Sequence, residues 1–302
     1  MAVDPKHDSA NGRKRSPRPQ KSHRDVADEL RARIRSGELQ PGHRMPTQAR
    51  LAEEFGVERG VVRQALRILQ AEHLLTNVSK GSPATVAADP VRALTGPGAP
   101  PQPTMVALAP RIGCAFGAAH VEIDALCLTA ISLTLAIGEP LRQIHAGGPK
   151  PAKVDVRVLL PSRDIDLAFP TPVDGSERGR LRRRWLAQRN AQVRVLQHNL
   201  LALRATHGID VQVTFRALPF TPPVKLYLLN GVEALFAYYT VERREEEVDH
   251  EFLEMYDAEG VQSLLFAFEQ GAALRDTTFV EQSHVWFNSL WETISSELVP
   301  TS

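Results

Sequence analysis

The sequence predicts an α+β protein of two domains: a small N-terminal domain of three helices and a β-hairpin, and a larger C-terminal domain of mixed α/β class. Three observations support this prediction. The chain has 302 residues, a length typical of two domains. Helical periodicity is concentrated between residues 26 and 73, and strand-like and helical segments alternate after residue 105. Between them, residues 89–104 contain five prolines and two glycines, as linkers do.

These patterns divide the chain into four parts. Residues 1–23 are rich in Lys, Arg, Pro and Ser, which predicts a disordered basic tail. Residues 24–88 make up the first folded domain, residues 89–104 the linker and residues 105–302 the second domain. The tail is either a solvated segment or a basic arm that adds contacts to phosphate groups.

The composition favours a globular cytoplasmic protein. Hydrophobic residues make up 43% of the chain and charged residues 24%, which are ordinary values. The sequence contains neither a signal-peptide core nor a run of roughly 18 apolar residues, so we expect no membrane partner. Cys114 and Cys127 lack the spacing of metal ligands, and we expect two reduced thiols and no cofactor.

The net charge of +1 is low for a nucleic-acid-binding protein. Residues 1–24 carry seven basic and two acidic side chains, whereas residues 25–90 carry nine of each. Electrostatics therefore permits DNA binding without demonstrating it, and the prediction depends on the geometry of a motif.

The first two helices of the N-terminal domain follow from apolar spacing and from their end signals. A first helix is predicted by apolar residues four positions apart, at Val26, Leu30 and Ile34, and by the stop at Ser36-Gly37. Thr47 is placed to cap a second helix over residues 48–55. Gly56 suits the left-handed turn that follows this helix.

The third helix is predicted to start near Glu58 and to run to about His73. Its inward face has the helical spacing i, i+3, i+4, i+7, at Val62, Ala65, Leu66 and Leu69. Residues 74–78 and 84–86 then predict a short hairpin with residues 79–82 at its tip. Such a hairpin after a helix-turn-helix is a wing, which can lie against the minor groove or the phosphates.

The outer face of the third helix predicts DNA recognition. Arginine forms bidentate hydrogen bonds with guanine and glutamine does so with adenine, and the start of a helix favours phosphate. A second helix and a three-residue turn precede this face, as in a major-groove reader. The expected DNA contacts are Arg44, Thr47, Gln48, Arg50, Arg59, Gly60, Val61, Arg63, Gln64, Arg67, Lys80, Gly81 and Ser82.

Residues 26–86 closely resemble the DNA-binding domain of the GntR family of bacterial regulators. The resemblance lies in Ile34-x-Ser36-Gly37-Glu38-Leu39-x-Pro41-Gly42, Met45-Pro46-Thr47, Leu51-Ala52-Glu53-Glu54-Phe55-Gly56-Val57, Arg59-x-x-Val62-Arg63-Gln64-Ala65-Leu66-x-x-Leu69 and Lys80-Gly81. It implies a winged helix-turn-helix. The DNA-contacting positions of the family fall on Thr47, Arg59, Gly60, Arg63 and Lys80-Gly81.

Three residues depart from the pattern of that family. Ala49 stands where members usually carry Arg, and Glu58 stands where they carry Ser or Thr. Gly60 replaces a usual Thr, which removes one side-chain contact. The carboxylate of Glu58 suits the helix dipole but repels phosphate. We therefore expect an operator that differs from those common in the family.

The second domain is predicted to be α/β and not all-helical. Expected strands include residues 154–160, 209–217, 225–229 and 234–241, and residues 123–135 are rich in β-formers at their start. The last two strands are joined by Asn230-Gly231, a type I′ turn signal. Expected helices are residues 178–207, 264–271 and 283–298.

Residues 222–231 resemble the H-x-K-x4-D strand and turn of the phospholipase D superfamily. Lys225 and Asn230 fall at the Lys and Asp positions, but Pro223 stands in place of the nucleophilic His. The resemblance implies a catalytically inactive relative, because a covalent phosphohistidine needs that His. The alternative is an ordinary hairpin with a solvated lysine.

An effector pocket is expected where loops follow the carboxyl ends of the strands. Ser162 and Arg163 follow the strand that ends near residue 160, and together with Lys225 and Asn230 they are the predicted effector-binding residues.

We expect a transcriptional regulator that is not an enzyme. Two copies bind a pseudo-palindromic double-stranded DNA operator, and an unknown small molecule acts on the second domain. Trp286 and Trp291 are candidate dimer-interface residues, or alternatively core residues. The alternatives are a DNA-binding adaptor that answers to a protein partner, and an enzyme regulated by the winged helix.

Overall fold

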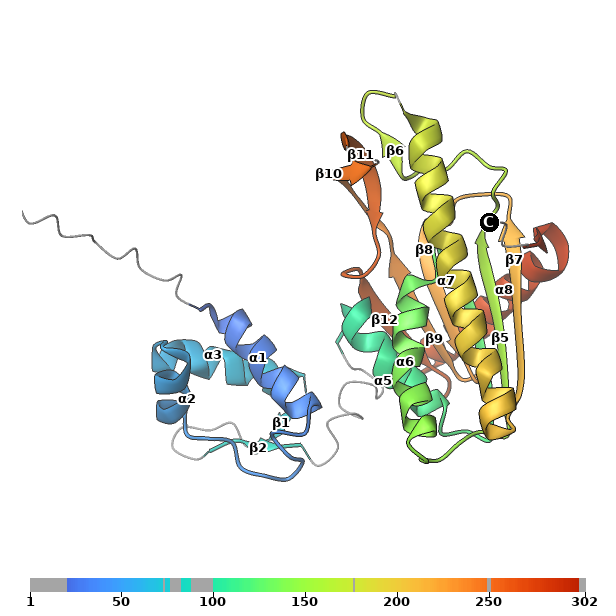
Figure 1. The fold of residues 1–302 in the computed structure, drawn as a ribbon. Coiled ribbons are helices and arrows are strands. Elements are labelled where there is room, and N and C mark those ends of the chain that lie inside the picture. Colours follow the sequence, from blue (N-terminus) through green and yellow to red (C-terminus); the bar gives the residue numbers. More distant parts are fainter. Residues whose placement is uncertain are drawn as a thin grey trace, which may run out of the picture. The chain divides into compact units, whose positions relative to one another are not determined.

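A computed structural model describes residues 21–72, 74–76, 83–87, 100–175, 177–248 and 251–298. The contacts divide the chain into two units, Met1–Ala93 and Leu94–Ser302 (Figure 1).

Three helices and a two-stranded hairpin make up the described part of the first unit. The elements are α1 (His23–Arg35), α2 (Gln48–Phe55), α3 (Arg59–Ala71), β1 (Leu75–Thr76) and β2 (Thr85–Val86). α1 begins earlier than its apolar residues because Ser22 and Asp25 form a capping box. The predicted inward residues of α1 and α3 are buried, which confirms both apolar faces.

Polar contacts fix α1 against α3 and extend the hairpin. The guanidinium of Arg31 in α1 donates to both carboxylate oxygens of Glu72, just after α3, at 2.9 and 2.6 Å. Arg44 forms an antiparallel bridge with Thr85 in β2, so the segment before α2 joins the hairpin as a third strand-like piece.

The second unit contains an eight-stranded sheet in its described residues. The strands are β3 (Gln102–Pro103), β4 (His120–Leu126), β5 (Lys153–Pro161), β7 (Asp210–Leu218), β8 (Val224–Leu229), β9 (Glu233–Tyr238), β12 (Leu264–Glu269) and β13 (Ser296–Glu297). Their order is β13-β7-β5-β4-β8-β9-β12-β3, and β4, β5 and β7 are parallel.

Helices cover the two faces of this sheet unequally. The helices are α5 (Thr104–Ala115), α6 (Ile131–His145), α7 (Arg178–His207) and α8 (Leu274–Ser289), which continues as the short π-helix η1 (Leu290–Ile294). α5, α6 and α7 lie on one face and α8 on the other (Figure 1). β5 therefore alternates between buried and half-buried residues at its start and is continuously buried at its end, where α8 also packs.

A smaller sheet lies beside the start of α7. It consists of β6 (Thr171–Pro172), β10 (Thr240–Val248) and β11 (Glu251–Glu259), in the order β10-β11-β6. β10 follows β9 after Tyr239, so the chain leaves the large sheet and returns to it at β12. Figure 1 shows this hairpin extending past the large sheet.

Several sequence predictions for this unit are confirmed. α7 has the predicted bounds, 178–207, and the predicted strands near 154–160, 209–217 and 225–229 are β5, β7 and β8. Asn230 and Gly231 both have positive φ, of 51° and 72°, as the predicted hairpin turn requires.

Other predictions were wrong. Residues 264–271 were expected to be helical but contain β12, which pairs with β9 and β3. A short apolar run does not distinguish a helix from a buried strand, and here the neighbouring strands decide. The final helix ends at Ile294, because residues 296–297 pair with β7 as β13. Within the expected linker, residues 102–103 form β3 and Thr104 starts α5.

Candidate nucleic-acid interface and candidate ligand cavity

The turn between α2 and α3 has the geometry that its sequence predicts. The Thr47 hydroxyl accepts a hydrogen bond from the Arg50 amide at 3.3 Å and so caps α2. Gly56 ends α2 in the left-handed region with φ 64°, where a side chain would be strained. Glu58 precedes α3 and makes no side-chain cap, so its carboxylate remains at the start of the helix.

The predicted recognition face is open to solvent. Arg59, Arg63 and Arg67 stand four residues apart on α3 and are exposed, as are Gly60 and Gln64. The opposite face is buried against α1 and α2. α3 therefore presents a row of guanidinium groups on a rigid support.

The other predicted contacts that the structure describes lie on α3, on α2 and in the segment before α2. Arg44, Thr47 and Arg50 are exposed, and Gln48 and Val61 are half-buried. Arg44 lies beside β2 through its bridge with Thr85. The predicted wing residues Lys80, Gly81 and Ser82 lie outside the described residues.

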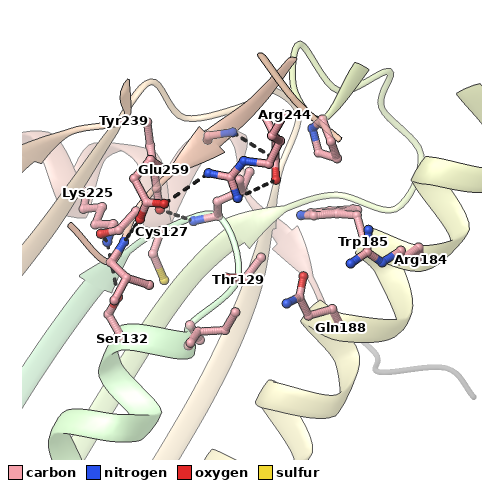
Figure 2. A pocket seen from close by; sticks show the side chains of 18 of the residues that line it. Cys127, Thr129, Ser132, Arg184, Trp185, Gln188, Lys225, Tyr239, Arg244 and Glu259 are labelled. Carbon is pink, nitrogen blue, oxygen red and sulfur yellow. Dashed lines mark hydrogen bonds and ion pairs between the residues drawn. The ribbon is translucent and has the colours of Figure 1, made fainter. Parts of the chain in front are cut away.

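A cavity of about 210 Å³ opens in the second unit at the end of β4 (Figure 2). One wall is the loop that joins β4 to α6, residues 127–130, together with the first turn of α6. The opposite wall is one face of α7, with Leu181, Arg184, Trp185 and Gln188. β10 and β11 and the loop after them, through Val261, complete the lining.

Lys225 lies at the base of this cavity with 2% of its surface exposed. Its ammonium donates to Ser132 Oγ at 3.2 Å and to the carbonyl of Gly260, and it lies 5.4 Å from the centre of the Tyr239 ring. Burial lowers the pKa of Lys225 to about 8. The same burial raises the pKa of the neighbouring Cys127 thiol to about 11.

Acidic and arginine side chains are paired across the rest of the lining. Arg244 contacts Glu259 at 3.1 Å and Asp257 at 3.7 Å, and Arg184 pairs with Glu246. Burial would raise the pKa of Glu259, but the amides of Gln262 and Val261 and the Arg244 guanidinium lower it. The charges of these five side chains sum to one negative charge, because Arg244 faces two carboxylates.

One polar atom on the α7 wall has no hydrogen-bond partner in the part of the chain that the structure describes. Trp185 is 4% exposed, and its indole Nε1 makes no hydrogen bond to any described residue. Figure 2 shows this indole extending from α7 into the space that faces Thr129. The sequence prediction missed Trp185, because only the α7 packing reveals that the indole lines a cavity.

The structure does not bring all four predicted effector residues together. Lys225 lines the cavity, but Ser162, Arg163 and Asn230 are not among its lining residues. Asn230 is at the opposite end of β8, where its amide accepts from the Glu122 amide and donates to the Ala115 carbonyl. Ser162 and Arg163 follow β5, and the Arg163 carbonyl accepts from Arg182 on α7.

A second cavity of about 730 Å³ lies over the other face of the sheet. Its floor is the polar first halves of β4, β5 and β7, and its wall is α8 with Trp291. Arg157 donates to both oxygens of Asp124 and stacks on Trp291, whereas Asp155 Oδ1 and His284 Nε2 are buried there without a hydrogen-bond partner among the described residues. Trp291 also stacks on Phe287, which gives it a packing role, whereas Trp286 is 41% exposed.

Within the described residues, no group of three or more His, Cys, Asp or Glu side chains is arranged to hold a metal ion. No helix in this part of the chain is long and apolar enough to cross a membrane.

Comparison with known proteins identifies the first unit. Residues 23–86 match the family described as bacterial regulatory proteins, gntR family. The chain is 46% identical over 56 residues to the mannosyl-D-glycerate transport/metabolism system repressor MngR of Escherichia coli (strain K12), covering 18% of this chain and 23% of that protein. It is 42% identical over 65 residues to the HTH-type transcriptional repressor NagR of Bacillus subtilis (strain 168), covering 22% and 26%.

The chain thus spans about a quarter of the length of these curated relatives. Among solved structures, the N-terminal domain of AraR in complex with a mutant ORR3 is 32% identical, with a TM-score of 0.20, over 22% of this chain and 91% of that one. Residues 23–86 are a GntR-family winged helix-turn-helix domain, and the described second unit is a mixed helix and sheet region. The phospholipase D-like resemblance stays a prediction.

Proposed function

Because residues 23–86 form a GntR-family winged helix-turn-helix domain, we propose that this protein is a sequence-specific transcriptional regulator of the cytoplasm. It binds a pseudo-palindromic DNA operator as a homodimer, and a small molecule in the Lys225 cavity controls it. The observation that carries this proposal is the exposed arginine row of α3, set on a buried apolar face. We assign no reaction to the second unit.

The α3 face supports base recognition as well as phosphate contact. Arg59 and Gly60 stand at the start of the helix, where backbone N–H groups also favour phosphate. Arg63 and Gln64 follow one turn later and offer bidentate hydrogen bonds to base edges. Glu58 opposes phosphate at the same helix start, which makes the arginines the main source of affinity.

We expect a dimer because a pseudo-palindromic operator has approximate two-fold symmetry. Two copies of α3 placed one DNA turn apart read the two half-sites of a palindrome. The relatives MngR and NagR are named repressors, and we extend repression to this chain as part of the proposal.

A continuous set of hydrogen bonds supports control by the cavity. The loop after β11 lines the cavity with Gly260 and Val261. The carbonyl of Val261 accepts from the Met105 amide at 3.0 Å, and the carbonyl of Ser263 accepts from the Thr104 amide and hydroxyl at 2.9 and 2.8 Å. Thr104 follows directly on β3 and the segment that leads back to residues 24–88. A ligand that moves this loop would therefore also move the start of α5, which these hydrogen bonds hold.

An electrophoretic mobility shift with the DNA upstream of its own gene tests this proposal. We expect the wild-type chain to shift this DNA, and Arg63→Ala to bind about 5- to 150-fold more weakly, the cost of one base contact. Arg275→Ala removes an exposed arginine from the second unit and is the charge-matched control. Equal binding by Arg63→Ala and the wild type would contradict the role of α3.

The response to small molecules distinguishes the proposed ligand-controlled regulator from the alternative, a DNA-binding adaptor that answers to a protein partner. The midpoint temperature of thermal unfolding should shift in the presence of at least one compound from a set of metabolites and nucleotides. That compound should also change the affinity of the protein for the operator. Retained DNA binding with no shift by any compound would favour control by a protein partner.

A further inference from the structure

The first turn of α6 opens on the Lys225 cavity with backbone amides that lie ahead of the first helical hydrogen bond. α6 is fifteen residues long, and its first helical bond runs from the Thr134 amide to the Ala130 carbonyl. Ala130 precedes the helix with φ 59° and provides no side-chain cap. The amides of Thr129 and Ala130 lie against the Cys127 thiol. Those of Ile131 and Ser132, which also line the cavity, have no partner within the helix.

The indole of Trp185 supplies an independent donor from the opposite wall. Its Nε1 is buried without a partner among the described residues, although a buried N–H normally finds an acceptor. Thr129 and Trp185 face each other across the cavity in Figure 2. An acceptor between them would satisfy both the indole and the start of α6.

The charge of Lys225 favours an acceptor that is negative. Its hydrogen-bond partners, Ser132 Oγ and the Gly260 carbonyl, are both neutral. The nearest acid, Glu259, already accepts from Arg244 and from two backbone amides. The positive end of the α6 dipole adds to the field of the ammonium.

We propose that the first turn of α6, the indole N–H of Trp185 and the Lys225 ammonium form a binding site for the carboxylate or phosphate group of a small organic anion. A volume of about 210 Å³ holds about seven water molecules, which limits the ligand to on the order of ten non-hydrogen atoms. The regulatory meaning of this site rests on the proposed function, but the binding itself does not.

Titration calorimetry of the full chain with succinate, acetate and inorganic phosphate tests the site. We expect saturable binding of at least one probe to the wild type. Trp185→Phe keeps the ring and removes the donor, and it should weaken binding about ten- to hundredfold, the effect of losing one hydrogen bond to a charged group. Trp286→Phe makes the same change at an exposed position on α8 and should bind as the wild type does.

Lys225→Met is the second variant, and it should abolish most of the affinity and its pH dependence. Wild-type affinity should fall as the pH rises from 7 to 9, since the lysine then loses its charge.

Binding of phosphate but not of the carboxylates, or the reverse, identifies the anion class. Equal affinity of Trp185→Phe and wild type would overturn the proposal, as would no binding of any probe at 10 mM. If Trp185→Phe fails to fold, unchanged affinity in Lys225→Met would overturn it instead.

Operator binding is measured separately in the same proteins. Anion binding without any operator binding would contradict the regulatory function and leave this site intact. Operator binding without anion binding would overturn the site alone.

Discussion

Lys225 and Gly260 lie so close together that a side chain at position 260 would press against the lysine. A Cβ there would lie 3.0 Å from the Lys225 ammonium and 3.1 Å from a ring carbon of Tyr239. The Gly260 carbonyl also accepts a hydrogen bond from that ammonium. This glycine therefore lets the loop after β11 close over the buried lysine.

Gly260→Ala should destabilise the second unit by about 1–3 kcal/mol, because the added methyl overpacks the contact with the buried Lys225 and displaces the lysine. Urea unfolding measures the free energy. Gly138→Ala is the matched control, since a Cβ at this exposed helical position meets no atom within 4 Å. The control should be neutral or stabilise α6 by up to about 1 kcal/mol. Equal stabilities of the two variants would contradict the close fit.

The buried charge of Lys225 should make stability depend on pH above neutrality. Burial lowers the pKa of Lys225 from 10.5 to about 8, so its charged form costs on the order of 3 kcal/mol in the folded state at pH 7. Between about pH 8 and 10.5 the unfolded chain binds more protons at this residue, and stability rises with pH as the cost disappears. Lys225→Met should thus be more stable than wild type at pH 7 and lose most of this advantage by pH 10.

Urea unfolding at pH 7 and pH 10 checks this dependence. Lys150→Met, a change at an exposed lysine, serves as the control and should leave the difference between the two pH values as it is in the wild type. A Lys225→Met advantage that stays constant from pH 7 to 10 would show that the lysine does not carry the effect.

The ion pair between Arg31 and Glu72 should contribute measurably to the first unit. Both side chains are 14% exposed, and the guanidinium meets both carboxylate oxygens. Glu72→Gln should cost about 1–3 kcal/mol, because it removes the carboxylate that meets the Arg31 guanidinium with both oxygens and leaves Arg31 to pair with Asp28, whose side chain is 68% exposed. Glu29→Gln removes a more exposed partner of Arg33 and should cost less than about 1 kcal/mol. Thermal unfolding of the full chain, followed through the transition of its first unit, measures the loss of stability in both variants. A loss in Glu72→Gln that is no larger than the loss in Glu29→Gln would show that the pair is dispensable.

The exposed apolar residues of α8 are expected to support the proposed dimer. Leu274, Val285 and Trp286 are 85%, 61% and 41% exposed. Trp286→Glu should weaken self-association by about thirtyfold or more, as expected for an aromatic residue at the centre of an interface. Analytical ultracentrifugation measures the dissociation constant, with Val195→Glu on α7 as the control. An unchanged constant in Trp286→Glu, or a loss of association only in Val195→Glu, would place the interface elsewhere.

Local signals in the sequence were sufficient to predict several elements of the fold. The apolar spacing of Val62, Ala65, Leu66 and Leu69 defined the inner face of α3 and thereby its arginine row. Gly56 and the Asn230-Gly231 turn were readable for the same reason, since each needs a positive φ that few residues adopt. α7 ended at the glycine that the sequence provides for its cap.

The features that join distant segments of the chain depend on its tertiary structure and could not be predicted from local signals. β12 was taken for a helix because its five consecutive apolar residues carry no period of their own, and its pairing with β9 and β3 settles its conformation. The cavity joins the start of α6, the first three turns of α7 and the loop after β11, which are spread over residues 131–261. Lys225 was visible as a candidate, but Trp185 and Gly260 were not. The role of Trp185 depends on its burial and on an indole N–H without an acceptor among the described residues. The role of Gly260 depends on the close approach of Lys225. Both features arise only when the chain packs.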